Sequence, residues 1–395
     1  MWNTKQYDIV VVGAGPAGST FARIAASDGL SVLLLEKKSQ IGAPVRCGEG
    51  VIGSDLHLFH EPRSEWIETT INKFCLFAPN GKSCTVKFDE VGYILNRTIF
   101  DNDLAVMAAE HGVTVSSKAY VNGLLIENNK VIGVKGLNNN KVFEIRSKLV
   151  IGADGVESRI GRMAGINTKL DLKDIGSGYQ KTISGIKTDK DVCTFYMSNN
   201  LAPGGYLWIF PKGNDRANVG IGISGRSSIN GKSAKKRLNE FIDSKYPNHK
   251  VESISIGGIP LSKPIKQMVT DGVMLIGDAA RTTDPLSGGG IILGMKSATK
   301  AANIAVKVLK NGIEPSTMNL MDYQKQWRDS EGKQINRIYR IKKAINKLTD
   351  KDLNHIVNKV NKLPKDKHSI SQIFRACVSL KPSLLIDVAK VFVGY

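Results

Sequence analysis

Hydrophobic residues in the first part of the chain fall into short runs that predict buried strands. Residues 7–12 (YDIVVV) and 31–36 (SVLLLE) read as strands buried on both faces, and residues 16–28 between them suit a helix. Two buried strands joined by a helix form a βαβ unit, which is how a parallel sheet begins.

The pattern changes after about residue 70. Residues 71–95 predict a hairpin with its turn at APNGKS. Residues 101–112 then predict a helix that Asp101 caps and Gly112 ends.

The second half of the chain divides into a strand-rich part and a helical part. Short strands around residues 121–136 read as a meander, and residues 175–260 are rich in strands apart from a helix near 233–245. This pattern predicts a second domain made largely of antiparallel sheet. Helical periodicity follows residue 288, and from about residue 317 the helices carry many Lys and Arg.

Composition narrows the class of protein. The 395 residues are long for a single hydrophobic core, which favours two or three domains. The 55 Lys and Arg against 36 Asp and Glu leave a net charge of +19, so an anionic partner is expected. No nucleic-acid-binding motif accompanies the charge, and we therefore expect no nucleic-acid partner.

Cysteine and histidine usage argues against disulfides and metal sites. The five cysteines are scattered and contain no CxxC pair, which predicts free thiols in a reducing compartment. The six histidines show no metal-ligand spacing, so no metal site is expected. We read no secretory signal and no apolar run near the roughly 20 residues that a membrane span needs, so a cytoplasmic protein is expected.

The glycine-rich segment GAGPAG (residues 13–18) is the strongest chemical signal. It lies between the first strand and the first helix, and Glu36 follows at the end of the second strand. Glycines allow a tight turn and a close approach of backbone to a pyrophosphate, the helix N-terminus supplies N–H donors, and the acid suits a ribose. The pattern predicts a dinucleotide site, and by itself it leaves NAD and FAD open.

Two further segments place an acid after an apolar strand, namely VIGADGVESRIGR (150–162) and GVMLIGDAARTTDPLSGGGIILGM (272–295). With these segments, with PVRCGEG (44–50) and with YLWIFP (206–211), residues 7–300 resemble the archaeal geranylgeranyl reductases, within the aromatic-hydroxylase-like flavoproteins. The part after residue 300 matches nothing motif by motif.

The resemblance implies FAD as cofactor and a set of residues that bind it. Asp278 would hydrogen-bond the ribityl or ribose part, and the glycines after Pro285 would bring backbone donors to the flavin ring. The implied cofactor-binding residues are Gly13, Gly15, Ala17, Gly18, Glu36, Lys37, Arg46, Cys47, Gly48, Arg97, Asp278, Pro285, Gly288, Gly289, Gly290 and Ile291. For Arg97 a surface position flanking a helix is a rival reading, and Asp154 either caps a turn or lies near the cofactor.

The expected fold class is therefore α/β, with a Rossmann-type FAD-binding domain interleaved with an antiparallel-sheet substrate domain and a helical C-terminal region. The expected boundaries are 1–70, 93–165 and 264–312 for the FAD-binding domain, 71–92 and 166–263 for the substrate domain, and 313–395 for the helical region.

Residues 206–211 alternate in a way that predicts an aromatic face on a strand. Tyr206, Trp208 and Phe210 would share one face and Leu207 and Ile209 the other. Plain core packing also explains such a strand, but the preceding PGG and the resemblance favour a wall for an apolar substrate. The expected substrate-lining residues are Tyr206, Trp208, Phe210 and Pro211.

Cys47 is placed between Arg46 and Glu49 in a glycine-flanked loop. Reducing an isolated alkene requires a proton donor near the flavin, and Cys47 is a candidate. An inert cysteine beside a pyrophosphate-binding Arg46 is the alternative. The expected catalytic residues are Cys47, Tyr206 and Trp208.

The resemblance implies an enzyme that saturates the geranylgeranyl chains of isoprenoid membrane lipids. Its electron donor would be NAD(P)H, a ferredoxin or another reduced carrier. A flavin monooxygenase and an electron-transfer flavoprotein remain alternatives. The basic C-terminal helices, including Lys342, read as a solvated face or as a peripheral contact with an anionic membrane, and residues 383–395 are amphipathic enough to dock on protein or lipid.

Overall fold

The computed structural model of the chain describes residues 6–229 and 233–380. It divides into two compact units, each assembled from three separate stretches. Unit 1 comprises residues 1–45, 97–169 and 262–336, and unit 2 comprises residues 46–96, 170–261 and 337–395. The amphipathic stretch 383–395 lies outside the described residues.

Unit 1 is built on a largely parallel sheet with the strand order β15-β16-β9-β1-β2-β6, in which the edge pair β15–β16 is antiparallel. Its strands are β1 (Tyr7–Val12), β2 (Val32–Leu35), β6 (Thr114–Ser116), β7 (Ala119–Glu127), β8 (Lys130–Asn138), β9 (Lys141–Gly152), β15 (Val269–Thr270) and β16 (Val273–Leu275). The neighbours β1–β2, β1–β9, β2–β6 and β9–β16 are parallel, whereas β7, β8 and β9 form an antiparallel meander. The predicted βαβ start and the meander are both present.

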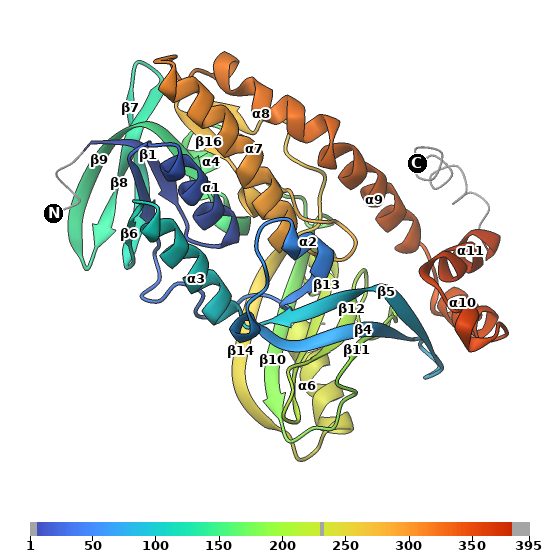
Figure 1. Cartoon of the computed structure of the whole chain (residues 1–395). Helices are drawn as coiled ribbons and strands as arrows, with labels where there is room; N and C mark the ends of the chain where they lie inside the picture. Colours follow the sequence, from blue (N-terminus) through green and yellow to red (C-terminus); the bar gives the residue numbers. More distant parts are fainter. Residues whose placement is uncertain (1–5, 230–232, 381–395) are drawn as a thin grey trace. The chain divides into compact units, whose positions relative to one another are not determined.

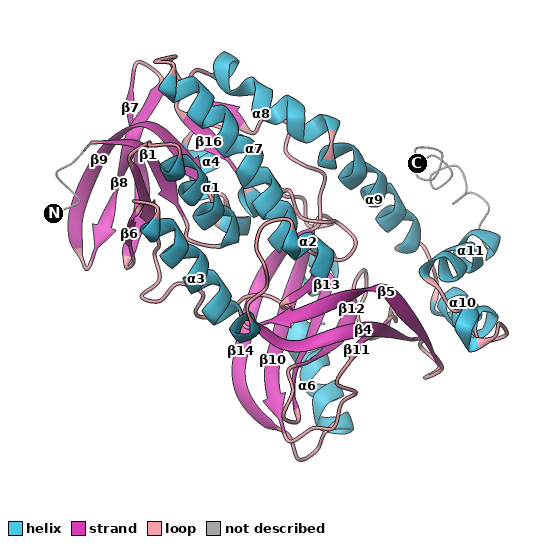
Figure 2. Cartoon of the chain, viewed as in Figure 1, coloured by secondary structure: helices cyan, strands magenta, loops and turns pink. Residues whose placement is uncertain are grey.

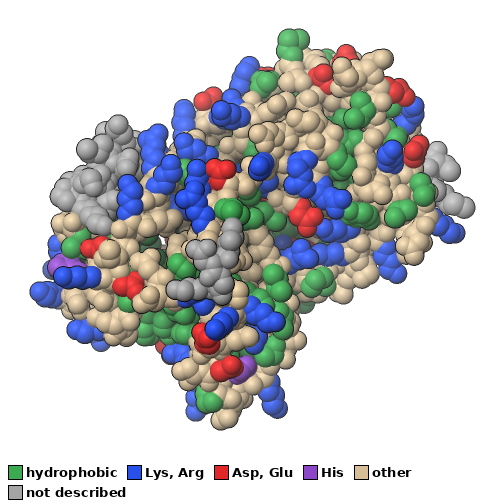
Figure 3. All heavy atoms as spheres, turned by 180° about the vertical axis from the view of Figure 1, so that it is seen from behind, with side chains coloured by type: hydrophobic (Ala, Val, Ile, Leu, Met, Phe, Trp, Pro, Cys, Tyr) green, Lys and Arg blue, Asp and Glu red, His purple; other side chains and the backbone are tan. Residues whose placement is uncertain are grey.

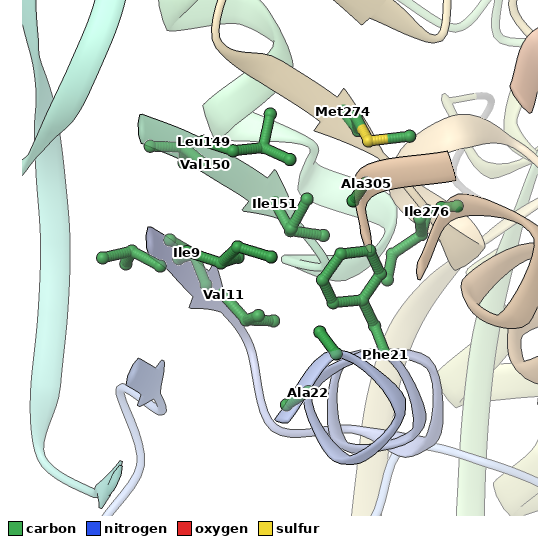
Figure 4. Close-up of a cluster of buried hydrophobic side chains, with 14 of the residues drawn as sticks. Ile9, Val11, Phe21, Ala22, Leu149, Val150, Ile151, Met274, Ile276 and Ala305 are labelled. Atoms are coloured by element: carbon green, nitrogen blue, oxygen red, sulfur yellow. The ribbon is translucent and has the colours of Figure 1, made fainter. Parts of the chain in front are cut away.

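The helices of unit 1 include α1 (Pro16–Ser27), α3 (Arg97–Glu110), α4 (Arg159–Met163), α7 (Ile291–Lys310) and α8 (Thr317–Asp329), with short 3-10 turns η3 (Gly155–Glu157) and η4 (Gly277–Ala280). Helix α1 packs against α3 and α7 (Figure 1). Figure 4 shows how α1 packs on the sheet: Phe21 of α1 points into the cluster formed by Ile9, Ile151 and Ile276. Burying such apolar surface contributes about 25 cal/mol per Å², so this cluster stabilises the unit.

Helix α3 begins earlier than predicted. It starts at Arg97, so Asp101 is an interior residue of the helix and the prediction that it caps the N-terminus is wrong. Asp101 is buried and pairs with Arg97 one turn away, at 2.6 Å between Oδ1 and Nε. A buried carboxylate requires such a partner, and this need outweighs the capping preference of Asp.

Unit 2 contains a second sheet with the order β14-β10-β13-β12-β11-β4-β5-β3, drawn in magenta in Figure 2. Its strands are β3 (Gly50–Ile52), β4 (Ile67–Phe77), β5 (Ser83–Leu95), β10 (Ile175–Ser184), β11 (Val192–Tyr196), β12 (Tyr206–Pro211), β13 (Arg216–Ser224) and β14 (Lys250–Pro260). All neighbours are antiparallel except β4 and β11. The hairpin expected at residues 71–95 is β4–β5.

The helices of unit 2 cover different parts of this sheet. They include α2 (Gly53–His57), α5 (Gly225–Ile229), α6 (Ala234–Lys245), α10 (Asp350–Val360), α11 (Ile370–Leu380) and the 3-10 turns η2 (Ser64–Trp66) and η5 (Lys365–Lys367). Helix α6 packs on β10 and β13 through Leu238 and Ile242. Helices α10 and α11 bury Val357 and Ala376 against Cys84 and Ala78 of the β4–β5 hairpin.

Helix α9 (Glu331–Ile345) contradicts one expectation about charge. Lys342 is 5% exposed, so its assignment to a solvated face is wrong. Its Nζ donates to the carbonyl oxygen of Leu261 at 2.6 Å and lies 3.9 Å from Oδ1 of Asp174. Burial lowers the pKa of Lys342, and the nearby Asp174 carboxylate partly opposes this.

The predicted and observed boundaries differ. Residues 46–70, expected in the nucleotide-binding domain, belong to unit 2. Residues 313–395, expected as a separate helical region, are divided, with 313–336 in unit 1 and 337–395 in unit 2. The first difference matters most, because it places Arg46, Cys47 and Gly48 with the antiparallel sheet.

Candidate functional site

The turn between β1 and α1 depends on two glycines. Gly13 has φ of +109°, and a Cβ there would lie 2.3 Å from the carbonyl oxygen of Ala153. A Cβ at Gly18 would lie 1.9 Å from the carbonyl oxygen of Gly13. At Gly15, in contrast, a Cβ would meet nothing within 4 Å. The turn therefore leaves no room for a side chain at Gly13 or Gly18, whereas the space beside Gly15 is empty.

The N-terminus of α1 is suited to an anion. Gly15 occupies the N-cap position and offers no side-chain cap, and the first turn contains no acidic residue. The first N–H groups of the helix thus have no side-chain acceptor from the cap, and the helix dipole places partial positive charge beside them. A pyrophosphate fits this arrangement.

Glu36 shapes the same turn. One carboxylate oxygen accepts from the backbone N–H of Ala14 at 3.0 Å, and the other accepts from the N–H of Lys38 at 3.0 Å. Lys37 is about half exposed, and its Nζ lies 3.7 Å from Glu157. Glu36 therefore fixes the loop, and ionised carboxylate oxygens keep further acceptor capacity for a ribose.

Ala17 lies where three segments of unit 1 approach closely. A Cβ at Gly277 would be 3.1 Å from the Cβ of Ala17, and a Cβ at Gly294 would be 3.5 Å from it. Small residues at these positions allow α1, η4 and α7 to pack together. Ala17 thereby holds the glycine turn against the segment that carries Asp278.

Asp278 lies in η4 and is partly buried. Its Oδ1 accepts from the hydroxyl of Thr283 at 2.6 Å. Burial raises the pKa of Asp278, while the Thr283 hydrogen bond and the charges of Arg281 and Arg97 act to lower it. A carboxyl group at this position can accept a hydrogen bond from a cofactor hydroxyl, and it can donate one when it is protonated.

The segment from Asp284 to Ile291 is a tight loop leading into α7. Oδ1 of Asp284 accepts from the N–H groups of Leu286 and Ser287, each at 2.8 Å. Pro285 is buried, Gly288 has φ of +75°, Gly289 is exposed, and α7 begins at Ile291. Gly290 is the N-cap of α7 without a side-chain cap, and a Cβ there would lie 3.0 Å from Oδ1 of Asp278.

Arg97 is held inside unit 1 and does not lie on a free surface. Its side chain is 14% exposed and donates to both carboxylate oxygens of Asp101, at 2.6 and 2.7 Å. Its charge also acts on the pKa of Asp278. The structure therefore brings Arg97 toward the Asp278 segment.

Sequence reasoning missed Arg281, which ties two loops of unit 1 together. It is 2% exposed, and Nη1 donates to the carbonyl oxygens of Val156 at 2.7 Å and of Asp278 at 2.9 Å. Nη2 donates to the carbonyl oxygen of Thr168 at 2.5 Å. Within the described residues, the buried Oδ1 of Asp154 in the first of these loops has no hydrogen-bond partner, and burial raises the pKa of Asp154. Such an orphaned acceptor suits a hydroxyl of a bound dinucleotide.

In unit 2, strand β12 has the predicted two faces. Leu207 and Ile209 pack into the core under α6. On the other face, the rings of Tyr206 and Phe210 each lie 5.5 Å from the ring of Phe195. Trp208 lies 5.9 Å from Tyr206 and 6.3 Å from Phe210.

The ring of Trp208 is accommodated by a glycine on the neighbouring strand. A Cβ at Gly220 would lie 2.2 Å from the indole ring, so only glycine leaves room for it. Tyr206 and Phe210 are partly buried, and Trp208 and Pro211 are buried. The aromatic face is therefore continuous across β11 and β12.

The segment with Arg46, Cys47 and Gly48 lies against this face. A Cβ at Gly48 would come within 3.0 Å of the Phe210 ring and 3.7 Å of Nε1 of Trp208. Cys47 is partly buried, and Arg46 is exposed. The structure thus brings Cys47 together with Trp208 and Phe210 in one unit.

Gln180 of β10 was also missed, although it joins these residues. Its Oε1 accepts from the indole N–H of Trp208 at 2.9 Å, and its Nε2 donates to the carbonyl oxygen of Cys47 at 2.9 Å. No local motif marks Gln180. The only signal is a polar residue at an inward position of a strand, and its partners lie 28 and 133 residues away.

In the part of the chain that the structure describes, no cluster of three or more His, Cys, Asp or Glu is placed to hold a metal ion. Over the same residues, no helix has both the length and the apolar character to cross a bilayer.

Comparison with known proteins identifies relatives of both units. Residues 174–259 match the family described as the geranylgeranyl reductase catalytic domain, and residues 11–72 match the NAD(P)-binding Rossmann-like domain. Digeranylgeranylglycerophospholipid reductase 1 of Methanococcoides burtonii is 42% identical over 98% of this chain and 95% of its own length. The digeranylgeranylglycerophospholipid reductase of Methanocella arvoryzae is 40% identical over 97% of this chain and 98% of its own.

Solved structures agree on the fold. A geranylgeranyl bacteriochlorophyll reductase-like protein of Thermoplasma acidophilum has a TM-score of 0.90 at 34% identity, over 98% of this chain and all of that one. The flavin-dependent brominase Bmp2 has a TM-score of 0.72 at 19% identity, over 96% of this chain and all of that one. The latter likeness concerns the fold alone, and the expected α/β fold class is confirmed.

Proposed function

Because this chain belongs to the family of the digeranylgeranylglycerophospholipid reductases, we propose that it reduces the C=C bonds of geranylgeranyl chains in isoprenoid membrane lipids. The protein is a flavin-dependent oxidoreductase. The observation that carries the proposal is the relationship over nearly the whole length of the chain.

The flavin is FAD, and unit 1 binds it. The open space at Gly15 and the uncapped N-terminus of α1 suit the pyrophosphate, while Glu36 and Asp278 suit its ribose and ribityl hydroxyls. The N-terminus of α7, with Gly290 as its uncapped N-cap, would offer backbone N–H groups to the ring and would stabilise negative charge there. When bound and reduced, FAD supplies the hydride and is itself oxidised.

The prenyl chain of the substrate lies against the aromatic face of unit 2. Tyr206, Trp208 and Phe210 offer apolar area, which is what an isoprenoid tail can bind. The polar headgroup contributes its own contacts through Lys or Arg side chains. Recognition of the tail then depends on ring contact and requires no hydrogen bonds along the chain.

Cys47 supplies the proton. Saturating an alkene adds one hydride and one proton, and no neighbouring carbonyl is present to accept the charge that develops. Protonation at the less substituted carbon leaves cation character at the more substituted one, which the hydride neutralises. The Cys47 thiol gives up its proton and becomes a thiolate, in a loop packed on Trp208 and Phe210.

The reducing equivalents come from NAD(P)H, a ferredoxin or another reduced carrier. The substrate is a membrane lipid and the chain carries +19 charges, so we propose peripheral contact with an anionic membrane. Figure 3 shows Lys and Arg side chains spread widely over one face of the molecule.

An anaerobic single-turnover assay tests the function. The purified protein is reduced with dithionite, mixed with digeranylgeranylglycerophospholipid without oxygen, and the lipid is analysed by mass spectrometry. We expect products heavier by two hydrogen atoms per reduced bond. An unchanged lipid under these conditions, with a hydroxylated product on admitting oxygen, would instead establish a monooxygenase.

The identity of the cofactor is tested separately. The chromophore released by heating the purified protein is chromatographed against FAD and FMN standards. We expect FAD. Release of FMN, or a colourless protein that takes up no flavin, would contradict the assignment of unit 1.

A further inference from the structure

The loop formed by residues 46–50, here the Cys47 loop, is anchored to the sheet of unit 2 at its first half by Gln180. This side chain is 6% exposed, and both ends of its amide are engaged. The Nε2 group donates to the Cys47 carbonyl oxygen, while Oε1 accepts from the Trp208 indole N–H, each at 2.9 Å. Because the two contacts require opposite ends of the amide, they fix its orientation.

The second half of the Cys47 loop is anchored by Glu49. Its side chain is 4% exposed, and its Oε2 accepts from Lys212 Nζ at 2.6 Å and from the Asn218 amide. Lys212 is itself 7% exposed, and its Nζ also lies 3.6 Å from Glu68. The carboxylate of Glu49 thus has an ammonium and an amide as partners, as a buried charge requires.

Glu49 also has an uncommon backbone conformation. Its φ is +74°, which few residues other than glycine adopt, and the side-chain anchor supports it. In this conformation the Glu49 N–H points at the Cys47 sulfur, with 3.2 Å between N and Sγ. An N–H donor at sulfur stabilises the thiolate relative to the thiol.

We propose that Gln180 and Glu49 are positioning residues that hold the Cys47 loop so that the Glu49 N–H stabilises the Cys47 thiolate. The role of that thiolate in catalysis rests on the proposed function. The loop geometry does not, since it follows from contacts within unit 2.

The arrangement also couples the thiol to the aromatic face. Trp208 and Cys47 share one amide, that of Gln180, so a shift of the indole ring changes the support of the Cys47 carbonyl. A lipid tail in contact with Trp208 thereby acts on the position of the proton donor.

The test measures alkylation of Cys47 by iodoacetamide in the purified full-length protein, without lipid and without turnover. Peptide mass spectrometry follows Cys47 alone. Gln180→Met keeps the length of the side chain and removes both hydrogen bonds. Gln180→Glu keeps an acceptor for Trp208 and loses the donor to the Cys47 carbonyl.

We expect alkylation of Cys47 at pH 8 to slow at least about threefold in Gln180→Met and in Gln180→Glu, because the thiolate fraction falls. A purely structural role predicts the opposite sign, since a loosened loop exposes the thiol and speeds its reaction. Equal or faster alkylation in the two variants would overturn the proposal.

Trp208→Phe provides an independent variant if substitution of Gln180 prevents folding. It keeps an aromatic ring on β12 and removes only the N–H that orients the Gln180 amide. Alkylation of Cys47 is expected to slow in this variant too. An unchanged rate would contradict the claim that the Gln180 amide, oriented by Trp208, positions the Cys47 loop. Because no step uses lipid, these results stand whether or not the protein reduces geranylgeranyl chains.

Discussion

The cysteines of this chain differ in how far the protein shields them from water. Burial raises the pKa of the Cys193 thiol to about 12 and that of Cys84 to about 11. Cys47 is partly buried and has a backbone N–H at its sulfur. Shielded thiols contribute packing, whereas Cys47 has the accessibility that chemistry requires.

For Cys47, we predict that Cys47→Ala keeps the flavin bound and slows single-turnover reduction of the lipid by about 100-fold, since a positioned general acid contributes at least that much. Cys75→Ala is the matched control, because Cys75 is also a partly buried free thiol of unit 2, on strand β4. Rapid-mix sampling with mass spectrometry gives the rates. Equal rates in the two variants would remove Cys47 from the reaction.

For Cys193, the raised pKa predicts a dependence of stability on alkaline pH. The unfolded thiol ionises near 9 while the folded one stays protonated until about 12, so stability present below pH 9 is lost as pH rises through this window. Urea unfolding at pH 8 and pH 10 should show a loss that is about 1 kcal/mol smaller in Cys193→Ala than in the parent protein. Parallel losses would mean that Cys193 ionises freely in the folded state.

At the scale of elements, the glycines of the turn before α1 are required for two different reasons, which the sequence motif alone does not distinguish. Gly18 is needed by the fold, because a Cβ there meets the Gly13 carbonyl oxygen, whereas Gly15 faces open space. The first is a constraint of packing, and the second is a constraint that only a bound dinucleotide imposes.

We therefore predict different outcomes for two equal substitutions. Gly18→Ala should lower the free energy of unfolding of the apoprotein by more than about 3 kcal/mol, because backbone must move. Gly15→Ala should leave it within about 1 kcal/mol and weaken flavin binding at least about tenfold. Urea unfolding of the apoprotein and fluorescence titration with FAD measure the two effects. A Gly15→Ala protein that binds FAD normally would place the pyrophosphate elsewhere.

The sequence predicted the elements best where local signals are strong. The runs at β1 and β2 and the alternation of β12 follow from periodicity alone, because burial on one or two faces dictates which residues can occupy a strand. Asp101 was predicted wrongly because α3 starts four residues earlier, at Arg97, and uses Asp101 as a buried ion-pair partner. Lys342 was predicted wrongly because its partners Leu261 and Asp174 are distant in the sequence.

The candidate site was predictable only in part, for the same reason. The glycine turn and Glu36 lie within one short βαβ segment and form a recognisable sequence motif for dinucleotide binding. Gln180, Lys212 and Arg281 act through partners more than 100 residues away, at the Cys47 carbonyl, at Glu49 and at Thr168. No local pattern encodes such contacts, and none could have been inferred before the fold was known.

At the scale of the whole molecule, the net positive charge is the property that most affects binding to other surfaces. A net charge of +19 creates an attractive potential toward anionic surfaces, which salt screens with a Debye length of about 10 Å at 0.1 M and about 3 Å at 1 M. Such binding needs no membrane-spanning helix.

We predict that the protein sediments with phosphatidylglycerol vesicles at about 0.05 M salt and is released at about 1 M, because screening removes the attraction. Phosphatidylcholine vesicles are the control and should bind little at either salt concentration. Salt-independent binding to both kinds of vesicle would indicate attachment by apolar contacts instead.

Each unit consists of three segments that are separated in the sequence, and this has a consequence for folding during biosynthesis. Strand β1 needs β9 beside it, and β9 needs β16, which emerges from the ribosome some 120 residues later. The parallel sheet of unit 1 therefore cannot be completed before β16 has been synthesised, and neither unit can be excised as one uninterrupted fragment. Until β16 is made, the apolar strands β1 and β9 lack part of their sheet, and such incomplete sheets favour aggregation of the nascent chain.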